Sequence, residues 1–427
     1  MAAFRPRGLY WGAALDATRE QGAPDAGDTP EVPDAAESPD GPPVMARMRA
    51  RGRSESHRAA TPLELFFDLC FVVAVAQAGR QLVHALAEGH PGHGITGYLM
   101  LFFAVFWAWM NFTWFSSAYD TDDALYRVVT LVQIAGVLIL AAGVPRAFDG
   151  DFAVVWFGYL VMRLAMVSQW LRAARNSTGR ERTTALRYAA GVTLCQVGWL
   201  VLLLSPDAAR PWVFVALAVA EMAVPTLAER DHQTSWHPHH IAERYGLFVI
   251  IVLGETVSAA TVAVQSAVDE QDALGDLLPI AAGGLLLIFA AYWIYFAVPI
   301  HLHLVSNRQA FVWGYGHYLV LGSAAAIGAG IEVAVEESVG KAHLSVFAAS
   351  ATVTVPGALF LFTVWLIHSR HQKRNLAQQL VLPVSSVLVL ACTFAGHAAV
   401  LLAGMVGAVT VAVGATLTAR QGQALES

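Results

Sequence analysis

Long apolar runs recur from residue 63 almost to residue 418, and short polar breaks separate them. A helix needs about 20 apolar residues to cross the hydrocarbon core of a bilayer, and these runs have that length. The pattern predicts an all-α, polytopic bundle of about twelve membrane-spanning helices. The predicted spans are residues 63–86, 97–117, 125–145, 151–172, 184–205, 211–228, 241–264, 276–298, 310–333, 343–368, 377–395 and 398–418. Only Gly396 and His397 separate the last two runs, so eleven spans remain an alternative.

Composition agrees with a chain that lives in a lipid bilayer. Of its 427 residues 56% are hydrophobic and 14% are charged, and the mean hydropathy is +0.52, which is too apolar for a soluble protein of this size. We expect the bilayer as a partner and no nucleic acid, and the oligomeric state stays open. Cys70, Cys195 and Cys392 each lie inside an apolar run, so we expect reduced packing residues and no disulfide.

The first sixty residues differ from the rest of the chain. Residues 22–43 are rich in Pro, Ala, Asp and Glu without apolar periodicity, so residues 1–60 are expected to form a disordered N-terminal segment. No signal peptide is visible, so the first span should direct insertion itself. Five arginines precede that span and favour a cytoplasmic N-terminus: Arg47, Arg49, Arg51, Arg53 and Arg58.

Later loops fit this orientation. The loop after the fourth span and the loop after the tenth span are rich in basic residues, and both fall on the cytoplasmic side. The loops VDEQDALGD and EESVGK fall outside and are acidic. Twelve spans also return the C-terminus, with Arg420, to the cytoplasm.

Two stretches suggest a tandem duplication. Glu64 opens ELFFDLCFVV in the first span, and Glu243 opens ERYGLFVIIVLGE in the seventh. WMNF in the second span corresponds to WIYF in the eighth. A six-helix unit ends on the side where it began, so two copies would be parallel halves, residues 61–229 and 230–420, followed by a short tail of residues 421–427. The alternative is that apolar helices look alike whatever their origin.

Three blocks in order, ELFFDLCFVVAVAQ, FWAWMNFTWFSSAYDTDD and HPHHIAERYGLFVIIVLGET, resemble the bacterial low temperature requirement protein A (LtrA) family. The similarity runs from about residue 61 to about residue 418. Cys70 and Thr256 stand where Val and Ser are expected, and neither change touches a charged group. The resemblance implies a polytopic protein of the bacterial inner membrane and implies no established reaction.

Charged groups inside membrane spans are rare and are candidates for a transport pathway. Glu64 and Asp68 lie four residues apart on one helix face, where like charges repel unless one is protonated or a cation lies between them. Gln77 continues this face. The alternative is a carboxylate pair that caps the helix start, where the helix dipole favours negative charge.

The seventh span offers a counterpart. Glu243 and Arg244 lie at its cytoplasmic entrance, and Glu255 lies about 18 Å further along the axis. His239 and His240, at the same entrance, are weak candidates for metal ligands, because no full ligand set follows them.

Other polar residues complete the candidate pathway. Arg163 lies near the middle of the fourth span and needs a carboxylate partner, for which Asp68 and Glu255 are the best candidates. Glu221, which precedes Pro225, is a further candidate, and Asn111, His317 and Glu332 are weaker ones. The DTDD run, residues 120–123, is interpreted as a solvated turn with a cap for the third span.

These features favour a secondary transporter or a proton- or ion-coupled permease for an unknown small molecule or ion, without a cofactor. A membrane-embedded enzyme is the second class, and it is disfavoured because no GxSxG or HExxH motif is found. A sensory or scaffolding membrane protein is a further alternative.

Overall fold

The computed structural model describes residues 43–52, 59–271, 274–370 and 375–426. In these residues the chain forms α-helices, three short segments of other helical types and no strand, so the predicted all-α class is confirmed. The helices are α1 (Pro62–Ala87), α2 (Pro91–Tyr119), α3 (Ala124–Phe148), α4 (Ala153–Asn176), α5 (Gly179–Leu204), α6 (Arg210–Ala228), α7 (Pro238–Gln271), α8 (Leu274–Phe296), α9 (Asn307–Ser338), α10 (Val346–Val364), α11 (Leu376–Ala391) and α12 (Ala399–Glu426). The short segments are η1 (Ile300–His303), the π-helix η2 (Trp365–Ser369) and η3 (Cys392–Ala398).

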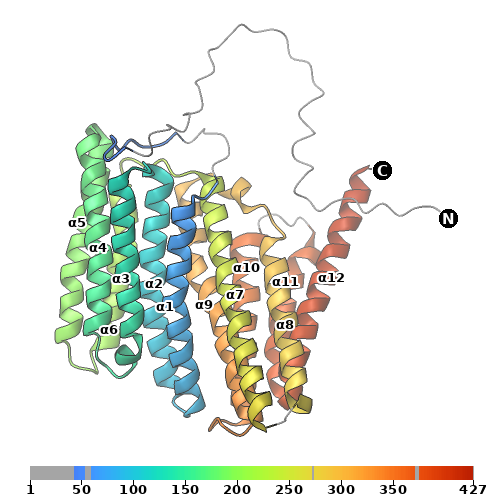
Figure 1. Ribbon diagram of the computed structural model, residues 1–427. Helices are drawn as coiled ribbons and strands as arrows, with labels where there is room; N and C mark the ends of the chain where they lie inside the picture. Colours follow the sequence, from blue (N-terminus) through green and yellow to red (C-terminus); the bar gives the residue numbers. More distant parts are fainter. Residues whose placement is uncertain (1–42, 53–58, 272–273, 371–374, 427) are drawn as a thin grey trace. The chain divides into compact units, whose positions relative to one another are not determined.

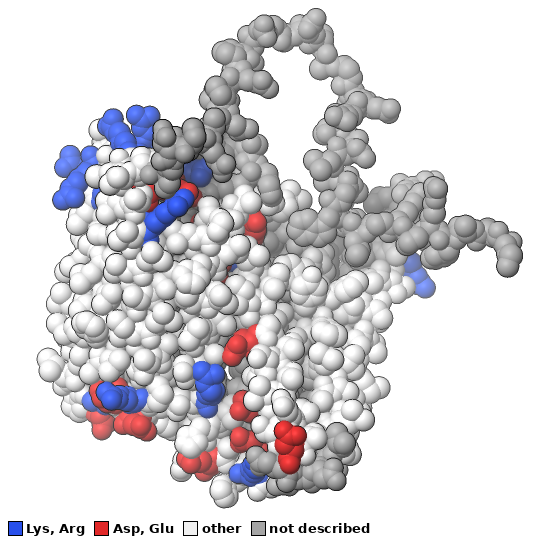
Figure 2. Space-filling view, viewed as in Figure 1, with Lys and Arg blue, Asp and Glu red and all other residues white. Residues whose placement is uncertain are grey.

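Most of these helices are long enough to cross a membrane. Among the described residues, 11 helical stretches are long enough and apolar enough to cross a membrane. In Figure 2 most charged side chains gather toward the two ends of the helices, with a belt of largely uncharged surface between them. The chain is therefore a multi-pass membrane protein.

The last two predicted spans belong to one helical stretch, Leu376–Arg420, of 45 residues. Gly396 breaks it, with a φ of 62° and a ψ of −138° that glycine tolerates without a steric penalty. The two arms then fold back on each other, because Gln378 Nε2 donates to Leu417 O at 3.4 Å and Thr410 Oγ1 donates to Ser385 Oγ at 2.6 Å. The eleventh stretch is thus a hairpin of α11 and α12, which Figure 1 shows as two neighbouring helices.

Most helix neighbours follow the same order in the two parts of the bundle, although α8 packs extensively on α12 and the corresponding pair α2 and α6 is less close. In the first part α1 packs on α2 and α3, and then α3 on α4, α4 on α5 and α5 on α6. In the second part α7 packs on α8 and α9, and then α9 on α10, α10 on α11 and α11 on α12. Helices α1 and α2 contact α7 and α9, so these four helices join the two parts (Figure 1).

Side-chain size sets how closely helices approach. A Cβ on Gly158 of α4 would lie 2.6 Å from Gly136 O of α3, and a Cβ on Gly404 of α12 would lie 2.2 Å from Gly283 O of α8. These helix pairs are therefore in backbone contact, as small residues allow in membranes. Helices α2 and α6 do not approach as closely, because large aromatic rings lie between them, such as Phe103 of α2 and Phe214 of α6.

Residues 43–52 pack against the bundle instead of continuing the expected disordered segment. Pro43 O accepts a hydrogen bond from Ala124 N at 3.1 Å, and the Met48 side chain is fully buried. The remainder of that segment, residues 1–42 and 53–58, lies outside the described residues. At the other end α12 continues to Glu426, so helix extends into the expected tail.

Candidate functional site

Glu64 begins a buried ionic network at the start of α1. It belongs to a capping box: the Thr61 hydroxyl accepts from Glu64 N at 3.3 Å, and Glu64 Oε2 accepts from Thr61 N at 2.9 Å. The same carboxylate reaches α7, where Arg244 NH1 lies 3.0 Å from Oε1 and His240 Nε2 lies 3.3 Å from Oε2. The capping interpretation therefore holds for Glu64, which also bridges the two parts of the bundle.

Asp68 has no capping role. Its carboxylate receives Arg244 NH2 at 2.5 Å, Arg244 Nε at 3.2 Å and the indole N–H of Trp109 at 2.7 Å. Trp109 stacks on Phe248, with ring centroids 4.3 Å apart. The Asp68 side chain is fully buried, so these three donors replace its hydration.

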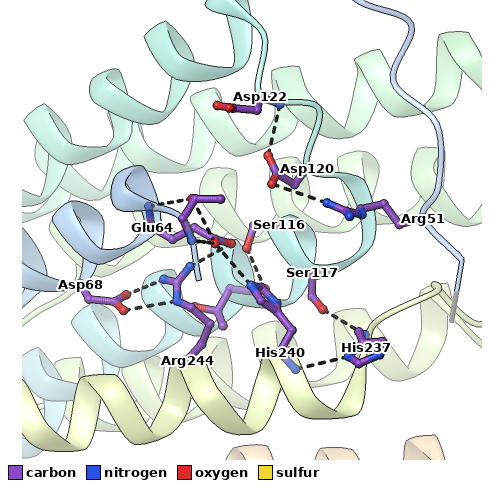
Figure 3. A network of polar contacts seen from close by, with 12 residues as sticks. Arg51, Glu64, Asp68, Ser116, Ser117, Asp120, Asp122, His237, His240 and Arg244 are labelled. Carbon is purple, nitrogen blue, oxygen red and sulfur yellow. Dashed lines mark hydrogen bonds and ion pairs between the residues drawn. The ribbon is translucent and has the colours of Figure 1, made fainter. Parts of the chain in front are cut away.

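Arg244 is the cation that allows two carboxylates to lie one helical turn apart. Its guanidinium lies between Glu64 and Asp68, and all three side chains are at most 1% exposed. We call Glu64, Asp68, His240 and Arg244 the α1–α7 network; Figure 3 shows how they point toward one another. Two carboxylates thus face one guanidinium, and the His240 ring lies beside Glu64.

The α2–α3 loop lies beside this network. Ser117 Oγ accepts from His237 N at 3.0 Å, which ties the end of α2 to the entrance of α7 (Figure 3). Arg51 NH1 lies 3.9 Å from Asp120, so the segment 43–52 reaches the same end of the bundle. The interpretation of DTDD as a turn with a cap is confirmed for Asp123, whose Oδ1 accepts from Tyr126 N at 2.8 Å.

Asp123 is nevertheless not solvated. Its side chain is fully buried and is paired with Arg172. Burial raises the pKa of Asp123, but hydrogen bonds from Arg172 and from the backbone N–H groups of Ala46 and Tyr126 outweigh it, so the pKa is lowered overall.

The predicted partner of Arg163 is wrong. Arg163 pairs with Glu221 of α6, and neither Asp68 nor Glu255 takes that role. Glu221 is fully buried and also accepts from Trp107 Nε1 at 2.8 Å. The Trp199 indole and the Tyr159 hydroxyl donate to its other oxygen. This ion pair lies within the first part of the bundle.

Glu255 lies in a small cleft further along α7. The cleft has a volume of about 40 Å³, enough for a water molecule, and α1, α7 and α9 line it. Its charged residues are Arg80, Glu255 and Glu332, and we call it the α1–α7–α9 cleft. Figure 2 shows positive and negative side chains side by side in the lower half of the face over α1 and α7. Arg80 is twelve residues beyond Asp68, about 18 Å along α1.

The remaining candidates are dispersed. His317 belongs to a buried group in the second part: Tyr295 OH lies 2.9 Å from its Nε2, and His368 Nε2 lies 3.4 Å from the same atom. Asn111 donates to Trp107 O at 2.7 Å. Gln77 is half-buried on α1 beside the cleft residues.

The entrance of α7 holds the other candidates. Glu243 and His239 are half-buried, and the His239 ring lies next to the His301 ring, tilted by 58° with 5.0 Å between the centroids. No group of three or more His, Cys, Asp and Glu that could hold a metal ion occurs in the part of the chain that the structure describes. Cys70, Cys195 and Cys392 are free thiols, as predicted.

Glu229, just after α6, was not identified from the sequence. It accepts from Tyr188 OH at 2.8 Å, Thr234 Oγ1 at 2.6 Å and Asn307 Nδ2 at 2.5 Å, and so links the two parts of the bundle. Burial raises its pKa despite these three donors. Trp109 was also missed, because an indole in an aromatic-rich helix is normally a packing residue.

Together these features define a multi-pass helical membrane protein whose two parts meet at a buried ionic network. Residues 59–417 match the family described as bacterial low temperature requirement A protein (LtrA), and the chain belongs to this family. The uncharacterized protein RA0937 of Rhizobium meliloti (strain 1021) is 28% identical over 212 residues, which cover 48% of this chain and 51% of that protein. The matched region thus spans about half the length of this relative.

Proposed function

We propose that this protein is a proton- or ion-coupled secondary transporter of a small molecule or ion. Its two six-helix halves, residues 61–229 and 230–420, would move against each other around α1 and α7. The repeated order of helix neighbours supports a tandem duplication with both copies in one orientation. We place it in the bacterial inner membrane.

Twelve crossings are part of this proposal. The α11–α12 hairpin supports counting its two arms separately, because a single helix of 45 residues would be about 67 Å long, more than twice the hydrocarbon thickness. With the arginines before α1 inside, twelve crossings place both termini in the cytoplasm.

One observation carries the proposal. The same pair of helices, α1 and α7, is sealed at one end by the fully buried α1–α7 network and holds the small, partly charged α1–α7–α9 cleft further along. In a transporter that is closed on the inward side, the polar groups of such a cleft would begin the outward-facing path. The network end corresponds to the cytoplasmic side of the predicted topology.

In this proposal, the movement of the two halves is coupled to ions when α1 separates from α7 at the network end. Arg244 and His240 would leave with α7, while Glu64 and Asp68 would stay on α1 without a cation. Two ionised carboxylates in an apolar environment are costly, so they take up protons or a cation when the halves separate. Closure expels these ions again, and Asp68, the deeper carboxylate, is the central coupling group.

Cysteine accessibility tests this proposal without knowledge of the substrate. In a background with the three native cysteines replaced, Ala259→Cys reports on the α1–α7–α9 cleft and Ser117→Cys reports on the network end. A small membrane-impermeant thiol reagent applied in right-side-out vesicles should label Ala259→Cys at a measurable rate, because Ala259 is only half-buried. Applied in everted vesicles, it should leave Ser117→Cys protected.

Asp68→Asn weakens the α1–α7 network and should change the two reporters in opposite directions. Labelling of Ser117→Cys from the cytoplasmic side should rise severalfold, and labelling of Ala259→Cys should fall. Rates that both rise would indicate unfolding or a continuous pore, and unchanged rates would remove the gating role of the network; either result contradicts the proposal.

A further inference from the structure

A large apolar groove lies between the two halves, on a face that the ionic residues do not reach. It has a volume of about 450 Å³ and is bounded by α1 and α2 on one side and by α9 and α10 on the other. Its lining runs from Pro91 and Leu344 at the loop end to Phe102 and Leu359 deeper in the bundle.

Polar atoms in the groove are already paired with the protein. Tyr98 OH donates to Gly322 O at 2.7 Å, and Tyr318 OH donates to Leu99 O at 2.8 Å. The two remaining lining hydroxyls, those of Ser323 and Thr352, donate to backbone carbonyls of their own or neighbouring helices. The groove therefore offers an occupant apolar surface without a hydrogen-bonding group, which disfavours water and polar solutes.

The length and width of the groove decide which apolar group can occupy it, an acyl chain or a helix of a second copy. From Phe347 to Leu359 the groove follows α10 for about 18 Å, close to half of a hydrocarbon core of about 30 Å. Over that length the space open to the centre of a water-sized sphere averages roughly 25 Å² in cross-section, which makes the groove about 8 Å wide once the radius of the sphere is added. A helix with its side chains is roughly 10–12 Å wide, so a helix of a second copy does not fit into the groove.

We propose that this groove binds one acyl chain of a membrane phospholipid, which enters from the leaflet next to the α1–α2 and α9–α10 loops. The occupant is held by van der Waals packing against the apolar lining, because an acyl chain that leaves the surrounding hydrocarbon for the groove gains no hydrophobic transfer energy. Because the groove separates the halves, the bound chain is a component of their interface.

Photolabelling in nanodiscs tests the proposal. The probe is phosphatidylethanolamine with a diazirine in the middle of one acyl chain, and adducts are mapped by peptide mass spectrometry. We expect adducts on α2 and α10 peptides at least fivefold above those on the exposed face of α5. Ala351→Phe fills the groove and should lower these adducts fivefold or more.

Val355→Trp, at a half-exposed position of the groove, serves as a second filling variant if Ala351→Phe folds poorly. Leu194→Phe is the matched control, because Leu194 is 72% exposed on α5 outside the groove, and it should leave groove labelling unchanged. Adducts spread evenly over all apolar faces, or equal groove labelling in wild type and both filling variants, would overturn the proposal.

Discussion

Removal of the Arg244 guanidinium should be among the most destabilising single changes in the bundle. Arg244 contacts Asp68 at 2.5 and 3.2 Å and Glu64 at 3.0 Å, and all three side chains are buried. Arg244→Gln therefore leaves two buried carboxylates without their cation. Loss of one partner of a buried ion pair costs about 3–5 kcal/mol, because the remaining charge stays desolvated.

The assay is thermal unfolding of the purified protein in one detergent at pH 7.5. A cost of this size should lower the apparent Tm of this 427-residue chain by about 3–6 °C. Arg127→Gln is the matched control, because Arg127 pairs with Asp122 at 2.8 Å with both side chains about half exposed. Exposed pairs contribute about 0–1 kcal/mol, so this variant should shift the Tm by less than about 2 °C.

A double variant distinguishes the effect of the stranded charges from the effect of lost side-chain packing. Asp68→Asn removes one of the two stranded carboxylates, so Arg244→Gln with Asp68→Asn should be more stable than Arg244→Gln alone, with a coupling of about 1–3 kcal/mol. Equal Tm losses for Arg244→Gln and Arg127→Gln, or no recovery in the double variant, would refute the reasoning.

Three further predictions concern other contacts. Arg163→Leu should lower the Tm by several degrees and Glu221→Gln in addition should recover part of the loss, whereas the same Tm in both would show that the pair is not coupled. Because the pKa of Asp123 is lowered, its ionised form stabilises the fold above the ordinary carboxyl pKa of about 4, and the advantage of wild type over Asp123→Asn in pH-dependent melting should shrink as the pH falls below that value. A pH-independent difference would contradict this. Gly396→Ala should cost about 1 kcal/mol or more in the same melting assay, because Gly396 has a positive φ, while Gly414→Ala, a helical glycine with open space around its Cβ, should not destabilise.

The apolar runs predicted most of the helices, because bilayer thickness fixes the length and composition of a span. The start of α1 was equally readable, since Thr61, Pro62 and Glu64 form a local capping signal. A hairpin within one long helical stretch was harder to predict, because it depends on the single conformation of Gly396.

Ion partners were only partly predictable. Depth along a helix identified Asp68 and Arg163 as costly charges, but depth does not give the rotation of the helix or its neighbours. Asp68 meets Arg244, which is 176 residues away, and Arg163 meets Glu221, which is 58 residues away. Packing of the whole bundle decides both pairings.

The central claim is that the network end and the cleft end open alternately. Distances between spin labels measured by pulsed electron resonance test it most directly. One pair, Asp122→Cys and Leu302→Cys, spans the halves at the network end, and a second pair, Asp149→Cys and Lys341→Cys, spans them at the opposite end. With Asp68→Asn, the account predicts a longer distance in the first pair and a shorter one in the second. Distances that stay unchanged in both pairs, or that lengthen in both, would contradict it.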